Sequence, residues 1–263
     1  MQDNPRDNRI AGFRGVFRAD AAARAVYSEA AGIAQIVPRA VAVPMDAEDV
    51  VGLVRWAGRT GTPLVPRGSG SSMAGGALGD GVIVDLRRLA ALGPVDAAAR
   101  AVGLQFPVDP SSGAYCTVGG MASTNSAGAH TLRYGAMRPW VEALDCVFAD
   151  GSRAEVRRGG APPDVPALRR FLAAAPALVD AERAAPSRHA GVRKESSGYG
   201  LAAYSDSGDL IDLLVGSEGT LVLIVGLELR LTPAFAATAS VLGAFASLDD
   251  AVIGAGGARD ARA

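Results

Sequence analysis

Apolar positions in the first third of the chain follow two different periods. Short apolar runs bounded by polar residues, glycine or proline predict strands at 41–43, 64–65 and 82–86. Between the first two, apolar residues recur at the spacing of one helical face: Val50, Leu53, Val54 and Ala57. Asp46, with Asp49 three residues on, is placed to start this helix in a near capping box, and Gly61 to end it. The region predicts a strand–helix–strand unit that feeds a loop and a third strand.

The middle of the chain predicts a second, mixed region. Apolar runs that we assign to strands lie at 141–148, 210–215 and 221–231. The Asp150-Gly151 pair predicts a hairpin turn into a further strand at 153–157. Prolines bound two predicted helices, at 166–175 and 177–184.

Three stretches lack a clear period. Residues 1–36 predict an irregular lead-in with one short helix near 20–31. Residues 100–135 are crowded with Gly, Pro, Ser and Asn, which predicts loops. The tail after Ala246 is rich in Ala and Gly, and we expect it to be poorly ordered.

Composition is typical of a soluble globular protein. Of 263 residues, 49% are hydrophobic and 20% charged, with a formal net charge of −1. This balance gives no reason to expect nucleic acid or an anionic membrane surface as a partner. The first 20 residues lack the apolar core of a signal peptide, and no run approaches the roughly 20 apolar residues of a membrane span. We expect a cytoplasmic protein, either free or peripheral to the membrane through a partner.

Few residues are suited to metal binding or acid–base catalysis. Cys116 and Cys146 show no CxxC spacing, and His130 and His189 are the only histidines. We expect two packed thiols and no metal site, and the sequence assigns no catalytic residue.

A glycine-rich loop, residues 65–76, follows the second predicted strand with the sequence Val-Pro-Arg-Gly-Ser-Gly-Ser-Ser-Met-Ala-Gly-Gly. Its glycines let the backbone approach a ligand, and its consecutive N–H groups can form a nest for a phosphate. A P-loop is excluded because the loop holds no lysine. A dinucleotide-binding fingerprint is excluded because Met73 breaks the glycine spacing and no helix follows. A flexible surface loop is the alternative.

Two further segments are rich in small residues. The middle segment, residues 109–128, holds Asp-Pro-Ser-Ser and then, from Cys116, Cys-Thr-Val-Gly-Gly-Met-Ala-Ser-Thr-Asn-Ser-Ala-Gly. Its hydroxyls and its amide can hydrogen-bond polar groups, so it predicts a binding surface, with ordinary loop structure equally open. The GSEGTL turn, residues 216–221, sets Glu218 between two glycines at a strand entrance, and a simple tight turn is equally open there.

The order and spacing of these three segments resemble the FAD-binding (PCMH-type) domain of the vanillyl-alcohol-oxidase superfamily. The group that the chain most resembles contains glycolate oxidase, D-lactate dehydrogenase and D-2-hydroxyglutarate dehydrogenase. The resemblance runs from about Ile36 to Pro233 and includes the RYG triplet at 133–135, the ADG hairpin at 149–151 and the KESSGY segment at 194–199. It implies an α+β fold in which a small βαβ subdomain, about 36–94, packs on a larger mixed sheet with helices, about 100–232, after a lead-in at 1–35.

The resemblance also implies which residues hold FAD. In the family the loop wraps the pyrophosphate, which falls here on Arg67, Gly68, Ser69, Gly70, Ser71, Ser72 and Met73. The second stretch lines the flavin and ribityl chain, which implies Pro110, Ser111, Thr117, Gly119, Gly120, Ser123, Asn125, Ser126 and Gly128. The turn closes over the cofactor through Glu218, Gly219 and the backbone as far as Ile224. Covalent members carry a His in the loop, where this chain has serines, so the FAD should be non-covalent.

The chain departs from the family pattern in two places. Between Pro94 and Ala101, about one strand-plus-helix unit that helps to hold the cofactor is missing. After Pro233 the family continues into a cap domain that supplies substrate-binding Arg and His residues. Here only residues 246–251 resemble its opening, which predicts 234–263 as a truncated cap domain or a disordered tail.

The resemblance implies the FAD-binding part of a flavin-dependent oxidoreductase. Its small-molecule substrate would be a D-2-hydroxy acid of the lactate or glycolate type, oxidised by hydride transfer to FAD. Electrons would pass to a quinone, a cytochrome or a partner subunit, and a cap-bearing or oxidase partner subunit would complete the enzyme. The alternatives are a non-catalytic FAD-binding subunit and a truncated product without activity.

Overall fold

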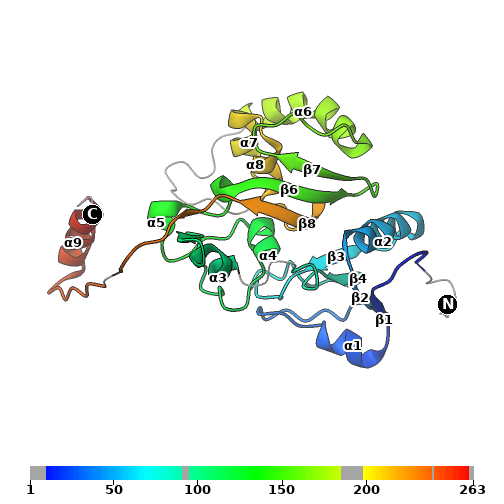
Figure 1. Cartoon of the computed structure of the whole chain (residues 1–263), viewed down its shortest axis with the longest axis horizontal. Coiled ribbons are helices and arrows are strands. Elements are labelled where there is room, and N and C mark those ends of the chain that lie inside the picture. The colour runs from blue at the N-terminus through cyan, green and yellow to red at the C-terminus, as the bar shows by residue number, and fades with distance from the viewer. Residues whose placement is uncertain (1–9, 91–94, 185–197, 239, 261–263) are drawn as a thin grey trace. The chain divides into compact units, whose positions relative to one another are not determined.

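The computed structural model describes residues 10–90, 95–184, 198–238 and 240–260 (Figure 1). The chain divides into two compact units, one ending at Thr232 and the other beginning at Pro233. The first unit holds two main sheets with their helices, which confirms the α+β fold class.

The N-terminal sheet has the strand order β1–β2–β4–β3. Strand β1 (Val16–Arg18) runs antiparallel to β2 (Ala40–Val43), while β4 (Val82–Asp85) runs parallel to both β2 and β3 (Leu64–Arg67). The prediction of an irregular lead-in is wrong, because β1 completes this sheet. Helix α1 (Ala21–Val26) lies within the predicted range, and the Asp20 carboxylate accepts the Ala23 N–H at its start.

Helix α2 (Ala47–Thr60) lies between the two sheets and is buried against both (Figure 1). One face packs on the N-terminal sheet: Leu53, Trp56 and Ala57. A second face packs against Val147 and Leu223 of the other sheet: Val50, Val51 and Val54. The four apolar positions predicted to share a helical face are all buried, but they are divided between two cores.

The ends of α2 form as the sequence predicts, with one difference. Asp46 accepts the N–H groups of Glu48 and Asp49, and Gly61 ends the helix with φ at 65°. Asp49, however, does not complete a capping box. Its buried carboxylate accepts the N–H groups of Met45 at 2.8 Å and Arg14 at 2.9 Å, and so ties the lead-in to the helix.

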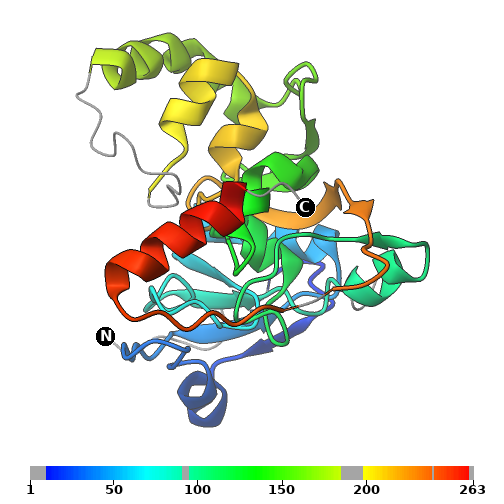
Figure 2. The ribbon, with the colours of Figure 1, turned by 90° about the vertical axis from the view of Figure 1, so that its left-hand side faces the viewer.

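The second sheet is antiparallel, with β6 (Val141–Phe148) between β7 (Arg153–Arg157) and β8 (Val222–Leu229). The predicted hairpin at Asp150-Gly151 is confirmed, and Gly151 adopts φ 74°. Helices α6 (Pro166–Ala184), α7 (Leu201–Ser207) and α8 (Leu210–Leu214) gather on one side of this sheet (Figure 2). They share its core with alternate β6 residues: Leu144, Cys146 and Phe148.

Two predictions in this region are wrong. Helix α6 is continuous through Pro176, although the sequence predicts a break there. Pro176 is exposed, so the carbonyl that lacks an N–H partner can be hydrated. The apolar run at 210–215 forms helix α8 instead of a strand, because Asp209 caps it by accepting the Ile211 N–H at 2.8 Å.

Short elements connect the two sheets: α3 (Val95–Arg100), β5 (Leu104–Gln105), α4 (Val118–Ser123), α5 (Thr131–Tyr134) and the 3-10 turn Arg138–Trp140. Helices α4 and α5 fall where loops are predicted, so that prediction is only partly right. The connection after Pro94, where the sequence predicts a missing strand-plus-helix unit, holds one short helix and a two-residue strand.

The second unit contains helix α9 (Leu248–Asp260), which follows β9 (Thr232–Pro233). The prediction of a poorly ordered tail is therefore wrong for residues 248–260, which form a helix. Ser247 starts the helix, since its hydroxyl accepts the Asp250 N–H at 3.1 Å.

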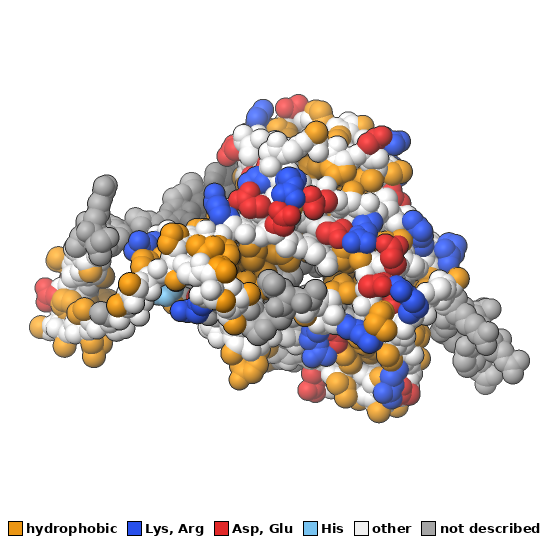
Figure 3. Space-filling view, viewed as in Figure 1, with side chains coloured by type: hydrophobic (Ala, Val, Ile, Leu, Met, Phe, Trp, Pro, Cys, Tyr) orange, Lys and Arg blue, Asp and Glu red, His pale blue; other side chains and the backbone are white. Residues whose placement is uncertain are grey.

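Acidic and basic side chains are interspersed over the face in Figure 3 and not grouped by sign. The exposed Arg157, for example, pairs with both Glu155 and Glu228. None of the described helices has the length and apolar character needed to cross a bilayer.

We expect Pro176→Ala to raise the free energy of unfolding by about 1–3 kcal/mol, because alanine restores an interior helix hydrogen bond. Urea unfolding measures this. Pro166→Ala is the matched control, since proline is tolerated at the first position of a helix and little gain is expected. Equal changes in the free energy of unfolding for the two substitutions would contradict the idea that Pro176 destabilises the interior of helix α6.

Candidate functional site

The three small-residue segments, far apart in the sequence, meet in the structure. A Cβ added at Gly68 would lie 2.3 Å from Thr117 Oγ1, so the glycine-rich loop touches the middle segment there. A Cβ added at Gly219, which has φ 80°, would lie 2.1 Å from Pro66 Cγ, so the loop also touches the GSEGTL turn. These close approaches explain glycine at both positions.

The middle segment and the GSEGTL turn are joined by backbone hydrogen bonds. The N–H of Gly216 donates to the Ala122 carbonyl and that of Glu218 to the Ser123 carbonyl, both at 2.9 Å. The acceptors lie at the end of helix α4, which Thr117 caps at its other end. Helix α4 therefore carries the turn on one end and meets the loop at the other.

The glycine-rich loop presents a run of unused backbone donors. Within the described part of the chain, the N–H groups of residues 69–73 donate no hydrogen bond to another protein group. Gly70 adopts φ 76°, and its carbonyl accepts the Ala31 N–H at 3.0 Å. Successive free N–H groups around a left-handed glycine suit an anion such as a phosphate.

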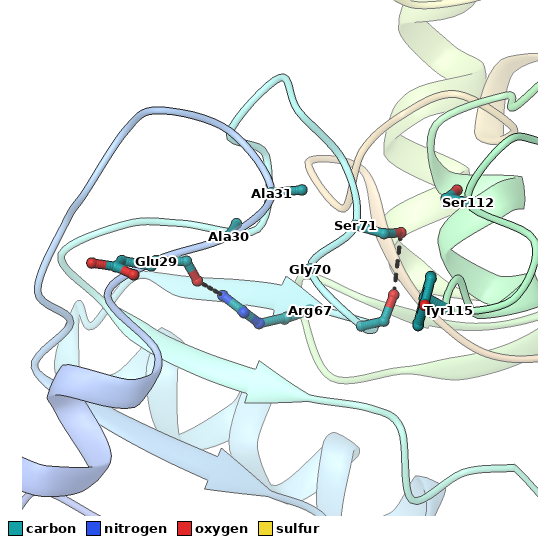
Figure 4. A pocket seen from close by; sticks show the side chains of 9 residues that line it. Glu29, Ala30, Ala31, Arg67, Gly70, Ser71, Ser112 and Tyr115 are labelled. Carbon is teal, nitrogen blue, oxygen red and sulfur yellow. Dashed lines mark hydrogen bonds between the residues drawn. The ribbon is translucent and has the colours of Figure 1, made fainter.

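Arg67, near the start of this loop, adds a positive charge (Figure 4). Its guanidinium lies 5.3 Å from the centre of the Tyr27 ring and donates to the Glu29 carbonyl at 2.8 Å. Burial lowers the pKa of Arg67, although a guanidinium stays charged at neutral pH. Among the described residues, no carboxylate oxygen pairs with it within 4.0 Å, so it is available to an anionic ligand.

Asp85, at the end of β4, holds Tyr27 and Arg87 next to the glycine-rich loop. It is 2% exposed, accepts from Tyr27 Oη at 2.5 Å, and receives three hydrogen bonds from the Arg87 guanidinium. Burial opposes ionisation of this carboxyl, but the hydrogen bonds from Arg87 and Tyr27 outweigh it and hold its pKa below the ordinary value. Asp85 therefore fixes the tyrosine on which Arg67 stacks.

Two hollows open on the same stretch of the middle segment. The first, about 550 Å³, lies between the lead-in, the glycine-rich loop and Ser112 and Tyr115 (Figure 4). The second, about 330 Å³, is lined by Asp109, Pro110, Ser111, Gly113, Ala114 and Ala129. Both volumes fall within the range of small-molecule sites.

The predicted site residues divide between these hollows and their supports. Arg67, Ser69, Gly70 and Ser71 line the first hollow, and Pro110 and Ser111 line the second. The others line neither: Gly68, Ser72, Met73, Thr117, Gly119, Gly120, Ser123, Asn125, Ser126, Gly128, Glu218, Gly219 and Ile224. For all of them a contact with FAD stays a prediction.

Three of these predicted residues have structural tasks. Asn125 is buried, and its Oδ1 accepts the Arg138 N–H at 2.9 Å. Gly128 lies against the Asp109 backbone, where a Cβ would be 1.7 Å from the carbonyl oxygen. Ile224 lies in the core of the second sheet, within β8.

Five residues of the first hollow are absent from the prediction: Glu29, Ala30, Ala31, Ser112 and Tyr115. The signal in the lead-in is the run of small residues at 30–32, where Gly32 passes the Met73 backbone so closely that a Cβ would be 2.5 Å from its carbonyl oxygen. Ser112 belongs to the DPSS quartet and could have been found with Ser111. Residues 194–197 of the KESSGY segment, and His189, lie outside the described residues.

The residues present fit the diphosphate of FAD. The free N–H groups and the Arg67 guanidinium offer donors and positive charge at one place, while glycines leave room for close approach. Among the described residues, no group of three or more His, Cys, Asp or Glu side chains could hold a metal ion.

We expect the buried Asp85 carboxylate to stabilise the fold at neutral pH by about 2 kcal/mol relative to Asp85→Asn. Because its folded pKa is depressed, this stability is present above the unfolded pKa of about 3.9 and is lost as the pH falls through the lower folded value. Urea unfolding of both proteins between neutral and acid pH measures the difference. Asp164→Asn, at an exposed ion pair, is the control and should change little. A pH-independent difference would contradict the ionised network.

The family described as "FAD binding domain" matches residues 38–98 and 90–157. The two matched segments overlap at 90–98, next to the place where the sequence predicts a missing strand-plus-helix unit. The match therefore covers the N-terminal sheet, the glycine-rich loop, the middle segment and the β6–β7 hairpin.

Curated relatives carry related names. The chain is 31% identical over 215 residues to D-2-hydroxyglutarate dehydrogenase of Xanthomonas citri, which covers 74% of this chain and 37% of the relative. It is 29% identical to D-lactate dehydrogenase of Archaeoglobus fulgidus (82% and 45%) and 26% identical to glycolate oxidase subunit GlcD of Bacillus subtilis (88% and 45%). The chain thus spans less than half the length of each of these relatives.

Solved structures show the same fold. Alkyldihydroxyacetonephosphate synthase superposes with a TM-score of 0.57 at 19% identity, over 84% of this chain and 41% of that one. 6-Hydroxy-D-nicotine oxidase of Arthrobacter nicotinovorans gives 0.50 at 20% identity, over 57% and 37%. The family match and the curated relatives agree: the chain belongs to the family described as "FAD binding domain", and FAD is its cofactor.

Proposed function

We propose that this chain is the FAD-binding part of a flavin-dependent oxidoreductase that oxidises a D-2-hydroxy acid. The observation that carries the proposal is the meeting of the glycine-rich loop, the middle segment and the GSEGTL turn around unused N–H donors and Arg67. The names of the relatives, which include D-2-hydroxyglutarate and D-lactate dehydrogenases, support this substrate class.

The chain's own residues bind and orient the cofactor. Loop N–H groups and Arg67 hold the diphosphate, helix α4 lies along the flavin and ribityl chain, and the GSEGTL turn closes over them. FAD, when bound, supplies the acceptor for a hydride from the hydroxyl-bearing carbon. The two proposed subdomains are about 36–94, with β1 of the lead-in added, and about 100–232, and the cofactor lies between them.

The remaining groups of the reaction are proposed to come from elsewhere. No acid or base for the substrate is assigned on this chain, so a cap-bearing partner or a further domain would supply it. Electrons would leave to a quinone, a cytochrome or a partner subunit, in the cytoplasm or at the membrane through that partner.

A non-catalytic FAD-binding subunit is the second candidate. It is supported by the printed name of one relative, a glycolate oxidase subunit. The two candidates share the cofactor and differ in whether bound flavin is reduced by a hydroxy acid.

We expect the purified protein to show a flavin absorption spectrum and to release FAD on denaturation. Under anaerobic conditions D-2-hydroxyglutarate or D-lactate should bleach the flavin, while the L-enantiomers serve as controls. Bound FAD that neither acid reduces would favour the non-catalytic subunit. A colourless protein that takes up no added FAD would contradict both candidates.

Gly119→Ala tests whether the cofactor lies along helix α4. A Cβ at Gly119 meets no protein atom within 4 Å, so the apoprotein should fold with unchanged or slightly higher stability. If the flavin side of FAD fills that space, its Kd should rise about tenfold, since a misplaced methyl group costs about 1–3 kcal/mol.

Gly58→Ala is the matched control for this substitution. Gly58 is exposed in helix α2, and a Cβ there also meets nothing within 4 Å. Its FAD affinity, measured by fluorescence quenching, should equal that of the wild type. Equal affinities of both variants would place the cofactor away from the first turn of α4.

A further inference from the structure

Arg138 contacts both the middle segment and Val215, the residue directly before the GSEGTL turn. Its main-chain N–H donates to Asn125 Oδ1 at 2.9 Å. Its guanidinium Nη2 donates to the carbonyl of Val215, directly before the turn, at 3.1 Å. One residue thus joins two segments that the chain separates by some ninety positions.

The surrounding backbone makes room for this guanidinium. A Cβ at Gly200 would clash with the Asp212 carbonyl oxygen and would lie 2.5 Å from Arg138 Nη2, so no larger residue fits there without moving one of the two. A Cβ at Gly216 would lie 3.4 Å from the same nitrogen. The guanidinium therefore lies beside two glycines, Gly200 and Gly216, and Gly216 is the first residue of the turn.

The Arg138 guanidinium loses part of its hydration in this position. Burial lowers its pKa, and its Nε is buried and has no hydrogen-bond partner among the described residues. In the described part of the chain, no carboxylate oxygen pairs with the guanidinium within 4.0 Å. A half-buried cation without an ion pair gives up part of its hydration, so the hydrogen bond to Val215 and the backbone bond to Asn125 are the contacts that fix it here.

A second arginine, Arg158, holds the backbone of Arg138. Arg158 Nη2 donates to the Arg138 carbonyl at 2.8 Å, and Arg158 Nη1 pairs with Asp212 at 3.0 Å. Ser207 donates to the other oxygen of Asp212 at 2.8 Å. The backbone of Arg138 is therefore anchored to helices α7 and α8, and its side chain reaches forward to the turn.

The held backbone is strained at two points. Asn125 (φ 46°) and Glu218 (φ 51°) are the non-glycine residues with positive φ in the described part of the chain. One lies in the middle segment and the other in the turn, on either side of the contacts that Arg138 makes. Such conformations cost about 1–3 kcal/mol each and persist only where the surroundings enforce them.

We propose that Arg138 is a positioning residue that locks the GSEGTL turn onto helix α4 and so sets the shape of the FAD cradle. This inference rests on the proposed cofactor site but requires no contact between Arg138 and FAD. The lock is built into the apoprotein, where the N–H groups of Gly216 and Glu218 report on it through their bonds to Ala122 and Ser123.

The test compares Arg138→Met with Arg138→Lys. In the apoprotein, amide hydrogen exchange at Gly216 and Glu218 should accelerate about tenfold or more in Arg138→Met, as expected for loss of a hydrogen bond from a charged donor. The Kd for FAD should rise by a similar factor. Arg138→Lys keeps a cationic donor for the Val215 carbonyl and should recover most of both effects.

Val156→Ala is the control for general loss of stability, because Val156 is buried in β7 and belongs to neither segment. It should leave exchange at the two amides and the Kd for FAD close to the wild-type values. If Arg138→Met fails to fold, the comparison of Arg138→Lys with Val156→Ala carries the test, with a smaller acceleration expected in the lysine variant.

Each other outcome has a distinct meaning. Wild-type exchange at Gly216 and Glu218 in Arg138→Met would overturn the lock, and weakened FAD binding alongside it would point to direct contact. Faster exchange with unchanged FAD affinity would overturn the link to the cradle. A wild-type protein that binds no FAD would refute the proposed function, and the exchange data alone would then decide whether Arg138 holds the turn.

Discussion

The packing of helix α2 against two sheets is the constraint on which the rest of the first unit depends. Val50 and Leu53 are both fully buried, yet they face different cores. Each fully buried side chain of this size contributes about 1.5–3 kcal/mol, so separating either sheet from the helix would be costly. The relative position of the sheets brings the glycine-rich loop, which leaves β3, against the middle segment at Thr117 and the turn at Gly219.

Local signals in the sequence were sufficient for the elements that have strong start and stop residues. Asp46 and Gly61 define α2, and Asp150-Gly151 defines the hairpin between β6 and β7. The failures lie where such signals are weak or are overruled. Strand β1 is only three residues long, too short to show an alternation, and α8 is buried on all sides, so its apolar run has no helical period. Only Asp209, read as a cap, would have identified that helix.

The site was predictable as segments but only partly as residues. The spacing of the loop, the middle segment and the turn matched a known family, whereas Glu29–Ala31 reach the first hollow only through tertiary packing. Arg138 is similar, since nothing in its local sequence shows that its side chain will reach Val215. Residues that act through backbone atoms of distant segments leave no periodic signal, and they account for most of what the sequence left out.

The double burial of α2 has a consequence for how a cofactor enters. The two sheets cannot swing apart as rigid bodies without exposing the apolar faces of the helix, so a hinge-like opening would be costly. Entry then depends on local excursions of the glycine-rich loop, where few internal hydrogen bonds oppose movement. Both the binding and the release of the cofactor would then follow the opening of this loop.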